Sequence, residues 1–402
     1  MRLFAQHGYG EGQKIIEGLQ QNLLDGIIYS PRDISLAKLR ELAQKIGSEL
    51  PATERLFDPQ FYATLIAVDP TSRLGYLEDD YAAYFGPRRY NQLISERQVT
   101  QDIRNVLEFQ LDLPLTSLIA PNIIISRSID SAEAAIAMEF IRNTGSEAKK
   151  IAQPKRVYAT LAIARDALIN TEELLRFLND ITVLDDPPDG FYILIATNNA
   201  EARADIFNAD VIAAWMLINH TLAVNGFDTI DGYSDLLTSF LGAAGAEAGA
   251  TGWWSNLRTF SLDRFSPPIG GGRQPVERYL SCSLLNRITF YELDVLRQVV
   301  PRVLNALPTD SFYPIDEGSQ PQRNKEVLQS WEAIKALNTQ LVVGNQVESL
   351  QRCQKAVKLA NNLYAEISLR NVALEPKSTD DHVGELESAL ASFERLAELD
   401  LS

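Results

Sequence analysis

The sequence predicts a (β/α)8 barrel of the TIM type, followed by an α-helical C-terminal region. Short apolar segments alternate with helical stretches from Leu3 to about Thr251, and nearly every apolar segment ends in a polar or charged residue. This alternation is typical of a barrel whose active site lies where the C-terminal ends of eight parallel strands meet. The predicted strands are Leu3–Gln6, Gly26–Ser30, Leu56–Phe61, Leu118–Ser126, Val157–Ala164, Phe191–Ala196, Phe227–Asp231 and Ala246–Thr251.

The first two strands are each followed by a turn and an amphipathic helix. After the first strand, two glycines mark a turn, and Ile15, Leu19 and Leu23 recur at helical spacing. After the second strand, Ser30-Pro31-Arg32-Asp33 forms the loop and Ser35 is the expected N-cap of the next helix. Two adjacent units of this kind favour a parallel sheet.

A long insertion follows the third strand, from about residue 67 to residue 115. Because loops after barrel strands lie over the active-site face, this insertion is either a lid or a partner-docking element. In the fourth strand Pro121 cannot donate a hydrogen bond to the ladder, so we expect a bulge or an early strand end there. The aromatic residues of the insertion are Tyr76, Tyr81, Tyr84, Phe85 and Tyr90.

The later strands also end in polar residues. Strand five ends at Arg165-Asp166, strand six at Thr197-Asn198-Asn199 and strand seven at Asp231. The helix that follows strand six and reaches Leu222 is apolar around most of its circumference. We expect such a helix to pack both on the barrel and on a further element.

Beyond Arg264 the pattern changes. Pro267-Pro268 and Gly270-Gly271-Gly272 predict a flexible connection, and helical periodicity without any strand continues from about Pro275. The chain is therefore expected to divide into a barrel over residues 1–265 and a helical region over residues 275–402. The predicted helices are Ser283–Leu307, Glu326–Leu341, Val347–Leu369 and a last one with the apolar stripe Leu386, Leu390, Phe393 and Leu396. That stripe either packs back on the chain or docks a partner helix.

Composition narrows the class of protein. The 402 residues are 46% hydrophobic, which is ample for a large core. The formal charge of −16 disfavours nonspecific binding to nucleic acid. Cys282 and Cys353 are far apart and have no clustered histidines, so neither a disulfide framework nor a zinc site is indicated. The N-terminus turns polar too early for a signal peptide and no segment resembles a membrane span, so a cytoplasmic location is expected.

The barrel mouth supplies the candidate site. His7 ends strand one beside two turn glycines, and an ordinary histidine pKa near 6.5 suits proton transfer. Asp58 and Asp231 supply a nucleophile or an acid–base pair. The predicted catalytic residues are thus Asp58, Asp231 and His7, and the predicted substrate-binding residues are Arg165, Asp166, Asn198, Tyr233, Trp253 and Arg258. No histidine pair has metal-ligand spacing, and no metal or cofactor is predicted.

The loop after strand eight is a second candidate feature. Barrels often bind phosphate with the loops after strands seven and eight, and Gly249-Ala250-Thr251-Gly252 is followed by Ser255, Asn256 and Arg258. We therefore expect a phosphate or ribose-phosphate site there. Trp253 and Trp254 either stack on a planar group of the ligand or pack against the C-terminal helices.

Two short segments resemble the tRNA-guanine transglycosylase-like barrel enzymes. They are Leu56-Phe57-Asp58-Pro59-Gln60-Phe61-Tyr62 and Gly226-Phe227-Asp228-Thr229-Ile230-Asp231. The resemblance implies Asp231 as nucleophile on a ribose anomeric carbon and Asp58 as helper at the base. The chain departs from the family at the glycine-rich base loop, where it has Leu161-Ala162-Ile163-Ala164-Arg165-Asp166, and at the cysteine-rich zinc site.

Two functions follow from these observations. The first is a barrel enzyme acting on a small polar or nucleotide-like substrate by glycosyl transfer or hydrolysis, with Arg165 and Arg258 binding anions. The second is a catalytically inert barrel that serves as a subunit of a bacterial multiprotein complex, such as a defence or modification system. In that case a protein partner docks on the helical C-terminal region or on the insertion at 67–115.

Overall fold

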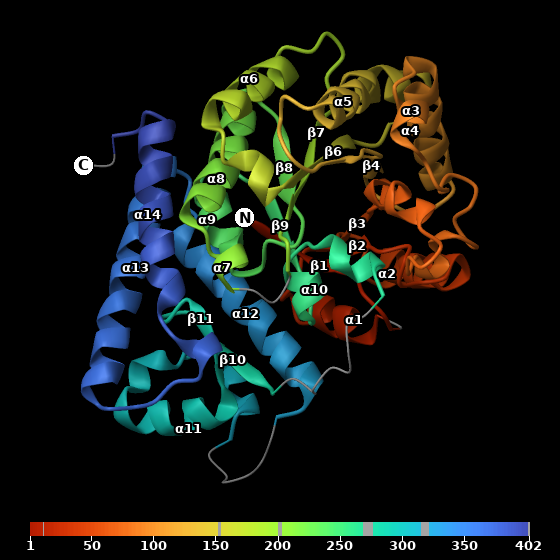
Figure 1. Ribbon diagram of the computed structural model, residues 1–402. Helices are drawn as coiled ribbons and strands as arrows, with labels where there is room; N and C mark the ends of the chain where they lie inside the picture. The colour runs from red at the N-terminus through yellow and green to blue at the C-terminus, as the bar shows by residue number, and fades with distance from the viewer. Residues whose placement is uncertain (11, 152–153, 200–202, 268–275, 315–320, 401–402) are drawn as a thin grey trace.

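The chain folds into the predicted barrel, and the computed structural model describes residues 1–10, 12–151, 154–199, 203–267, 276–314 and 321–400 (Figure 1). All strands of the main sheet are parallel, in the order β3-β2-β1-β9-β8-β7-β6-β4. Between β3 and β4, Thr116 N donates to Arg55 O over 2.9 Å and brings the two ends of the sheet together. The barrel strands are β1 Arg2–Gln6, β2 Gly26–Tyr29, β3 Glu54–Phe57, β4 Leu118–Ala120, β6 Val157–Ala164, β7 Gly190–Ala196, β8 Asp228–Asp231 and β9 Ala248–Thr251.

The fourth predicted strand is interrupted at Pro121, as expected. The chain forms β4 and then a separate β5, Ile124–Ile125, and both pair with β6. Asn122 fills the interruption, since its side-chain amide donates to Thr160 O over 2.8 Å and to Ala137 O over 3.2 Å. The third predicted strand, Leu56–Phe61, is wrong at both ends: the strand is Glu54–Phe57, and Gln60 adopts a left-handed φ of 52° before a 3-10 turn.

Helices follow the barrel strands around the outside of the sheet (Figure 1). The predicted cap of α2, Leu36–Glu49, is confirmed, because the Ser35 side chain accepts a hydrogen bond from Lys38 N. Shorter helices lie in the loops: α3 Tyr90–Leu93, α7 Arg203–Ile206 and α10 Ser255–Arg258. The outer helices are α1 Gln13–Gln20, α2 Leu36–Glu49, α4 Glu96–Leu111, α5 Ala132–Lys150, α6 Thr171–Thr182, α8 Ala209–Val224 and α9 Thr238–Ala243.

The aromatic residues of the 67–115 insertion form a small core of their own. Tyr81, Tyr84 and Phe85 are buried, and the rings of Tyr81 and Tyr84 pack on Phe57 and Phe109. Their hydroxyls donate to Ile34 O and Pro59 O over 2.9 and 3.1 Å. These contacts fix the insertion to the rim of the barrel.

The helix that completes the ring after β9 comes from the C-terminal region. Helix α12, Arg323–Leu341, contacts α1, α9 and β1. Its Trp331 is fully buried, and an added Cβ on Gly18 of α1 would lie 2.8 Å from the Trp331 ring. Gly18 therefore allows the close approach of these two helices, and α12 is part of the barrel wall.

The helix predicted over Ser283–Leu307 is confirmed only in part, because an antiparallel hairpin takes up its first residues. Strands β10, Arg278–Ser281, and β11, Asn286–Thr289, pair with Arg278 opposite Thr289. Helix α11, Phe290–Val299, follows directly. The hairpin was not predicted because each strand has four residues, which is too short to establish an alternating pattern. The predicted glycine connection, Gly270-Gly271-Gly272, lies outside the described residues.

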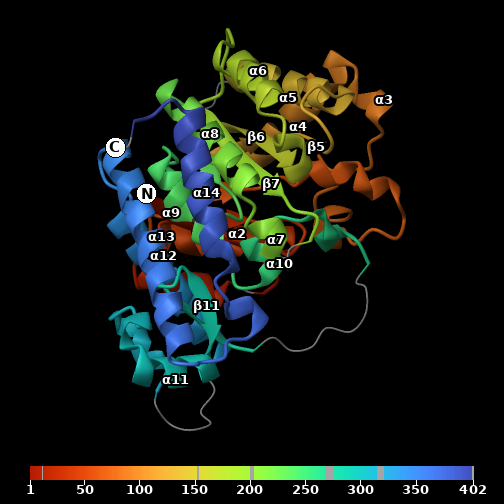
Figure 2. The same cartoon turned by 60° about the vertical axis from the view of Figure 1, so that its left-hand side comes forward.

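The last two helices, α13 Gln346–Leu369 and α14 Asp381–Leu396, pack against each other, and α14 covers α8 (Figure 2). Leu386, Leu390 and Phe393 of the apolar stripe are buried there. The stripe thus packs on its own chain. The 22-residue stretch Arg203–Val224, which contains α8, is apolar enough by composition to cross a membrane, but 56% of its apolar window is buried inside the protein. Its apolar character is explained by packing on both the barrel and α14.

Candidate functional site

The mouth of the barrel is filled by side chains. Arg264, which follows β9, is 1% exposed and donates to Asp33 Oδ2 over 2.5 Å and to the Tyr233 hydroxyl over 2.6 Å. The rings of Phe260 and Phe265 pack on Tyr62, with centroids 5.0 and 6.1 Å apart. A ligand therefore has no open route to the barrel axis through these residues, which we call the plug.

Asp58 lies beneath this plug and is fully buried. Its carboxylate accepts hydrogen bonds from Gln60 N over 2.9 Å and from the Tyr62 hydroxyl over 2.8 Å, and the Tyr192 hydroxyl lies 3.4 Å away. Burial raises the pKa of Asp58 to about 6 despite these hydrogen bonds. This pKa is closer to the range of a general acid, but the plug separates the Asp58 carboxylate from any ligand outside the barrel.

Asp231 points away from the barrel axis, toward α8. Its Oδ1 accepts hydrogen bonds from Trp215 Nε1 over 2.6 Å and from Asn219 Nδ2 over 3.1 Å, and both donors belong to α8. Thr229, two residues earlier on β8, also bonds Asn219. Successive side chains of a strand alternate between its two faces. Asp58 and Asp231, predicted to act together at the barrel mouth, therefore lie on opposite faces of the sheet, and only Asp58 is on the inner face.

His7 is buried between the barrel wall and Trp253. The ring centroids of His7 and Trp253 are 6.4 Å apart, and the Tyr29 ring lies 6.2 Å from His7 on another side. Neither ring nitrogen has a hydrogen-bond partner within the described part of the chain. Burial lowers the pKa of His7 to about 4, so the ring is neutral at pH 7. Its ring nitrogens therefore make no hydrogen bond to either predicted catalytic aspartate.

A large cavity lies beside the plug, between the loops after β7, β8 and β9 and the C-terminal hairpin with the start of α12. Its volume is about 1240 Å³. This is the C-terminal side of the barrel, where enzymes of this fold bind their substrates. Three of the six predicted substrate-binding residues line it: Tyr233, Trp253 and Arg258.

The other three predicted substrate-binding residues lie outside the cavity lining. Arg165 forms an ion pair with Asp205, and its Nε lies 3.5 Å from Asp166, whose side chain is 57% exposed. Asn198 is exposed, although its neighbours Thr197 and Asn199 line the cavity. The strand ends thus predicted cavity residues correctly only on the side of the barrel that adjoins the C-terminal region.

Arg258 was predicted from the sequence, but the other basic residues of the cavity were not. Among the described residues, seven basic and five acidic side chains line it, a local balance of +2 in a chain of net charge −16. The hairpin contributes Arg278 and Arg287, and α12 contributes Arg323. The density of arginine between residues 258 and 302 was an available signal, but without the hairpin it had no place in the fold.

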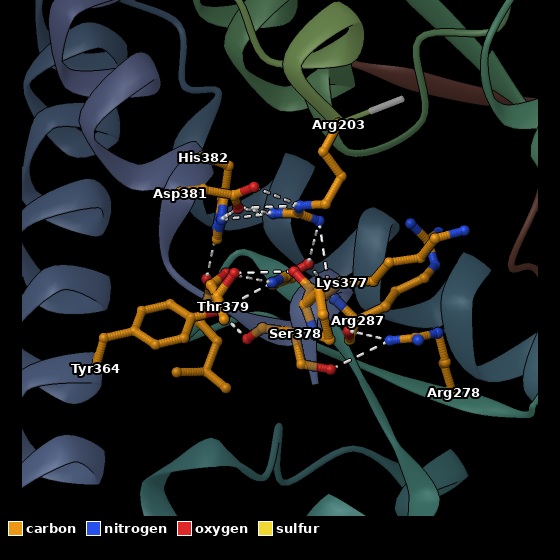
Figure 3. Close-up of polar contacts among 12 residues, drawn as sticks. Arg203, Arg278, Arg287, Tyr364, Lys377, Ser378, Thr379, Asp381 and His382 are labelled. Atoms are coloured by element: carbon orange, nitrogen blue, oxygen red, sulfur yellow. Dashed lines mark hydrogen bonds and ion pairs between the residues drawn. The ribbon is translucent and has the colours of Figure 1, made fainter. Parts of the chain in front are cut away.

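A polar corner ties the C-terminal region to the loop after β7 (Figure 3). Arg203 of α7 pairs with both carboxylate oxygens of Asp381, at 2.9 and 3.0 Å from its Nε. The same guanidinium contacts His382 Nδ1 over 3.0 Å and donates to Lys377 O over 3.1 Å. Because Arg203 and Lys377 also line the cavity, this corner holds its two sides together.

Comparison with other proteins gives limited information. No protein-family model and no curated protein matches the chain. A dihydrodipicolinate synthase structure from Bacillus clausii is 12% identical over 76% of this chain and 81% of that one, with a TM-score of 0.21. One from Oceanobacillus iheyensis is 12% identical over 98% and 96%, also with a TM-score of 0.21. Such low scores give no indication of activity, and they do not bear on the resemblance to transglycosylases.

The described residues also contain no group of three or more His, Cys, Asp or Glu side chains arranged to hold a metal ion.

Proposed function

We propose that this chain is a barrel enzyme that acts on a phosphate-bearing, nucleotide-like substrate in the cavity beside the plug. The observation that carries the proposal is the position of Arg258 and Trp253 on the loop after β9, in a large cavity lined by further arginines. Arginine matches the geometry of phosphate oxygens, and large concave pockets at the C-terminal face of barrels are the usual ligand sites.

The electrostatics of the cavity support an anionic substrate. The Arg258 side chain is only 15% exposed, and burial together with the nearby Arg287 lowers its pKa to about 10. Glu326 and Asp235 offset part of the repulsion between the two guanidinium groups, since they lie 3.5 Å from Arg258 and 2.5 Å from Arg287. A phosphate beside both groups would offset it further.

Asp263 is the carboxylate in the cavity best suited to acid–base chemistry. The other four acidic residues of the lining, Asp205, Asp235, Glu326 and Glu375, each form an ion pair with arginine. Within the described ranges no ion pair involves Asp263, which is exposed at the cavity. We assign it the role of general base for attack by water or an acceptor hydroxyl in hydrolysis or glycosyl transfer.

Replacing Asp263 by Asn tests this role. We expect the turnover rate of a panel of nucleotides, measured by the release of base or phosphate, to fall by about 100- to 10,000-fold. Ligand affinity should be kept or rise, because asparagine has nearly the size of aspartate and lacks the negative charge that repels a phosphate. Binding can be followed by tryptophan fluorescence, since Trp215, Trp253 and Trp254 line the cavity and only one of the four tryptophans lies elsewhere. Asp180→Asn, an exposed change on α6, is the control. Full turnover by Asp263→Asn would overturn the assignment.

The sealed mouth favours a second candidate function, the catalytically inert subunit of a multiprotein complex. Deleting the chain after Pro275 does not test it cleanly, because α12 is part of the barrel wall. An exposed apolar pair on α11 is a better target: Tyr291 and Val295 are 62% and 48% exposed. If the chain is such a subunit, we expect Tyr291→Ser with Val295→Ser to abolish co-purification of its complex and Asp263→Asn to leave the activity of the complex unchanged. The opposite pair of results would eliminate the subunit function.

A further inference from the structure

We infer that the substrate is a nucleotide that carries an additional apolar group, with its phosphates at Arg258 and Arg287 and the apolar group against α7 and the start of α8. This inference rests on the proposed function and specifies the substrate class of the same cavity.

The size of the cavity is the first observation. Pockets for drug-sized ligands span roughly 300–1,000 Å³. The volume of about 1240 Å³ exceeds that range. A ligand that contacted only the arginines would leave much of this space, including its apolar surface, in contact with water.

The charged side of the cavity is built for phosphate. Asp235 accepts from Arg287 Nη1 over 2.5 Å and from Nη2 over 2.8 Å, while Arg287 Nε is buried and has no hydrogen-bond partner among the residues described. Arg258 is held by the carbonyl oxygens of Gly252 and Trp253 at 3.3 and 3.2 Å. Arg258 Nη2 also lies 3.5 Å from Glu326 Oε1. The two guanidinium groups are therefore held in place before any ligand binds, which lowers the entropy cost of binding a phosphate beside them.

The other side of the cavity is apolar. It is formed by residues of α7, α8 and the loop after β8, among them Ile206, Phe207, Ile212, Trp215 and Leu236. Ile206 and Phe207 are only partly buried by the protein, so a ligand would remove further apolar surface from water. A nucleotide phosphate would bind at the charged side of the cavity, and an apolar substituent on the base or ribose would pack against the apolar side.

Calorimetric titration with four probes tests the inference: pyrophosphate, ADP, ADP with a benzyl group on N6 of the base, and ADP with a benzoyl group on the ribose. We expect at least one derivative to bind about 10-fold or more tightly than ADP, as burial of an aromatic ring predicts. If ADP binds and neither derivative binds better, this inference fails and the proposed function stands. If no probe binds, both fail.

Two variants make the result specific. Ile206→Ser with Phe207→Ser should remove the advantage of the benzyl or benzoyl group while ADP affinity is kept. Arg287→Gln should weaken all nucleotide probes by about 10-fold or more, since it removes a charged donor to phosphate. Val224→Ser, at an exposed apolar position at the end of α8, is the control. A retained advantage in the double serine variant would place the apolar group elsewhere and overturn the inference.

Discussion

Replacing Arg264 by Ala is expected to lower the free energy of unfolding by about 3–5 kcal/mol, because it removes one partner of a buried ion pair. Arg264 is 1% exposed and Asp33 is 7% exposed in their side chains. Burial by itself raises the pKa of Asp33, but Arg264 and Arg32 outweigh it and hold the pKa below the ordinary value. Without Arg264, the Asp33 carboxylate and the Tyr233 hydroxyl lose a charged partner in the plug.

Chemical denaturation at pH 7 measures this effect. The matched control is Arg176→Ala, because Arg176 and Asp130 form an ion pair with side chains 62% and 65% exposed. Such surface pairs contribute about 0–1 kcal/mol. The double change Arg264→Met with Asp33→Asn should recover part of the loss, since no charge is then left buried alone. A loss below about 1 kcal/mol for Arg264→Ala would show that water reaches the plug.

Much of the fold could be predicted because the barrel strands are buried apolar segments that alternate with amphipathic helices. The break at Pro121 and the double packing of α8 were also predictable, since both follow from local chemistry. The β10–β11 hairpin was not, because its strands have four residues each. The place of α12 in the ring depends on long-range packing of Trp331 over Gly18, which no local pattern reveals.

The sequence predicted where the site lies better than it predicted which residues form it. Strand ends correctly indicated the C-terminal face, where Tyr233, Trp253 and Arg258 line the cavity. They could not show that the segment carrying Phe260 and Arg264 folds back into the mouth and buries Asp58. They also left open which face of a strand its last residue occupies.

Asp231 is the last residue of its strand and lies on the outer face. Replacing it by Asn is expected to stabilise the protein above pH 7. Burial raises the pKa of Asp231 to about 7, from an ordinary value of 3.8. The folded state then holds a proton that the unfolded state has released, so this group lowers stability as pH rises from about 4 to about 7. The shift is roughly three pH units, which at about 1.4 kcal/mol per unit amounts to on the order of 4 kcal/mol. Asn removes this penalty and still accepts the hydrogen bonds of Trp215 and Asn219 through its amide oxygen. Its amide nitrogen replaces Oδ2, which has no partner among the described residues, so the net gain is below about 4 kcal/mol.

Denaturation of both proteins from pH 4 to pH 8 isolates the contribution of Asp231. The stability difference between Asp231→Asn and the parent should be small near pH 4, grow up to about pH 7 and then stay constant. Asp180→Asn, which is exposed, should show no such rise. The variant should also keep turnover, because the Asp231 carboxylate binds α8 rather than the cavity. A variant that is stable but inactive would instead support the nucleophile role implied by the resemblance to transglycosylases, and would require the buried Asp231 carboxylate to become accessible from the cavity.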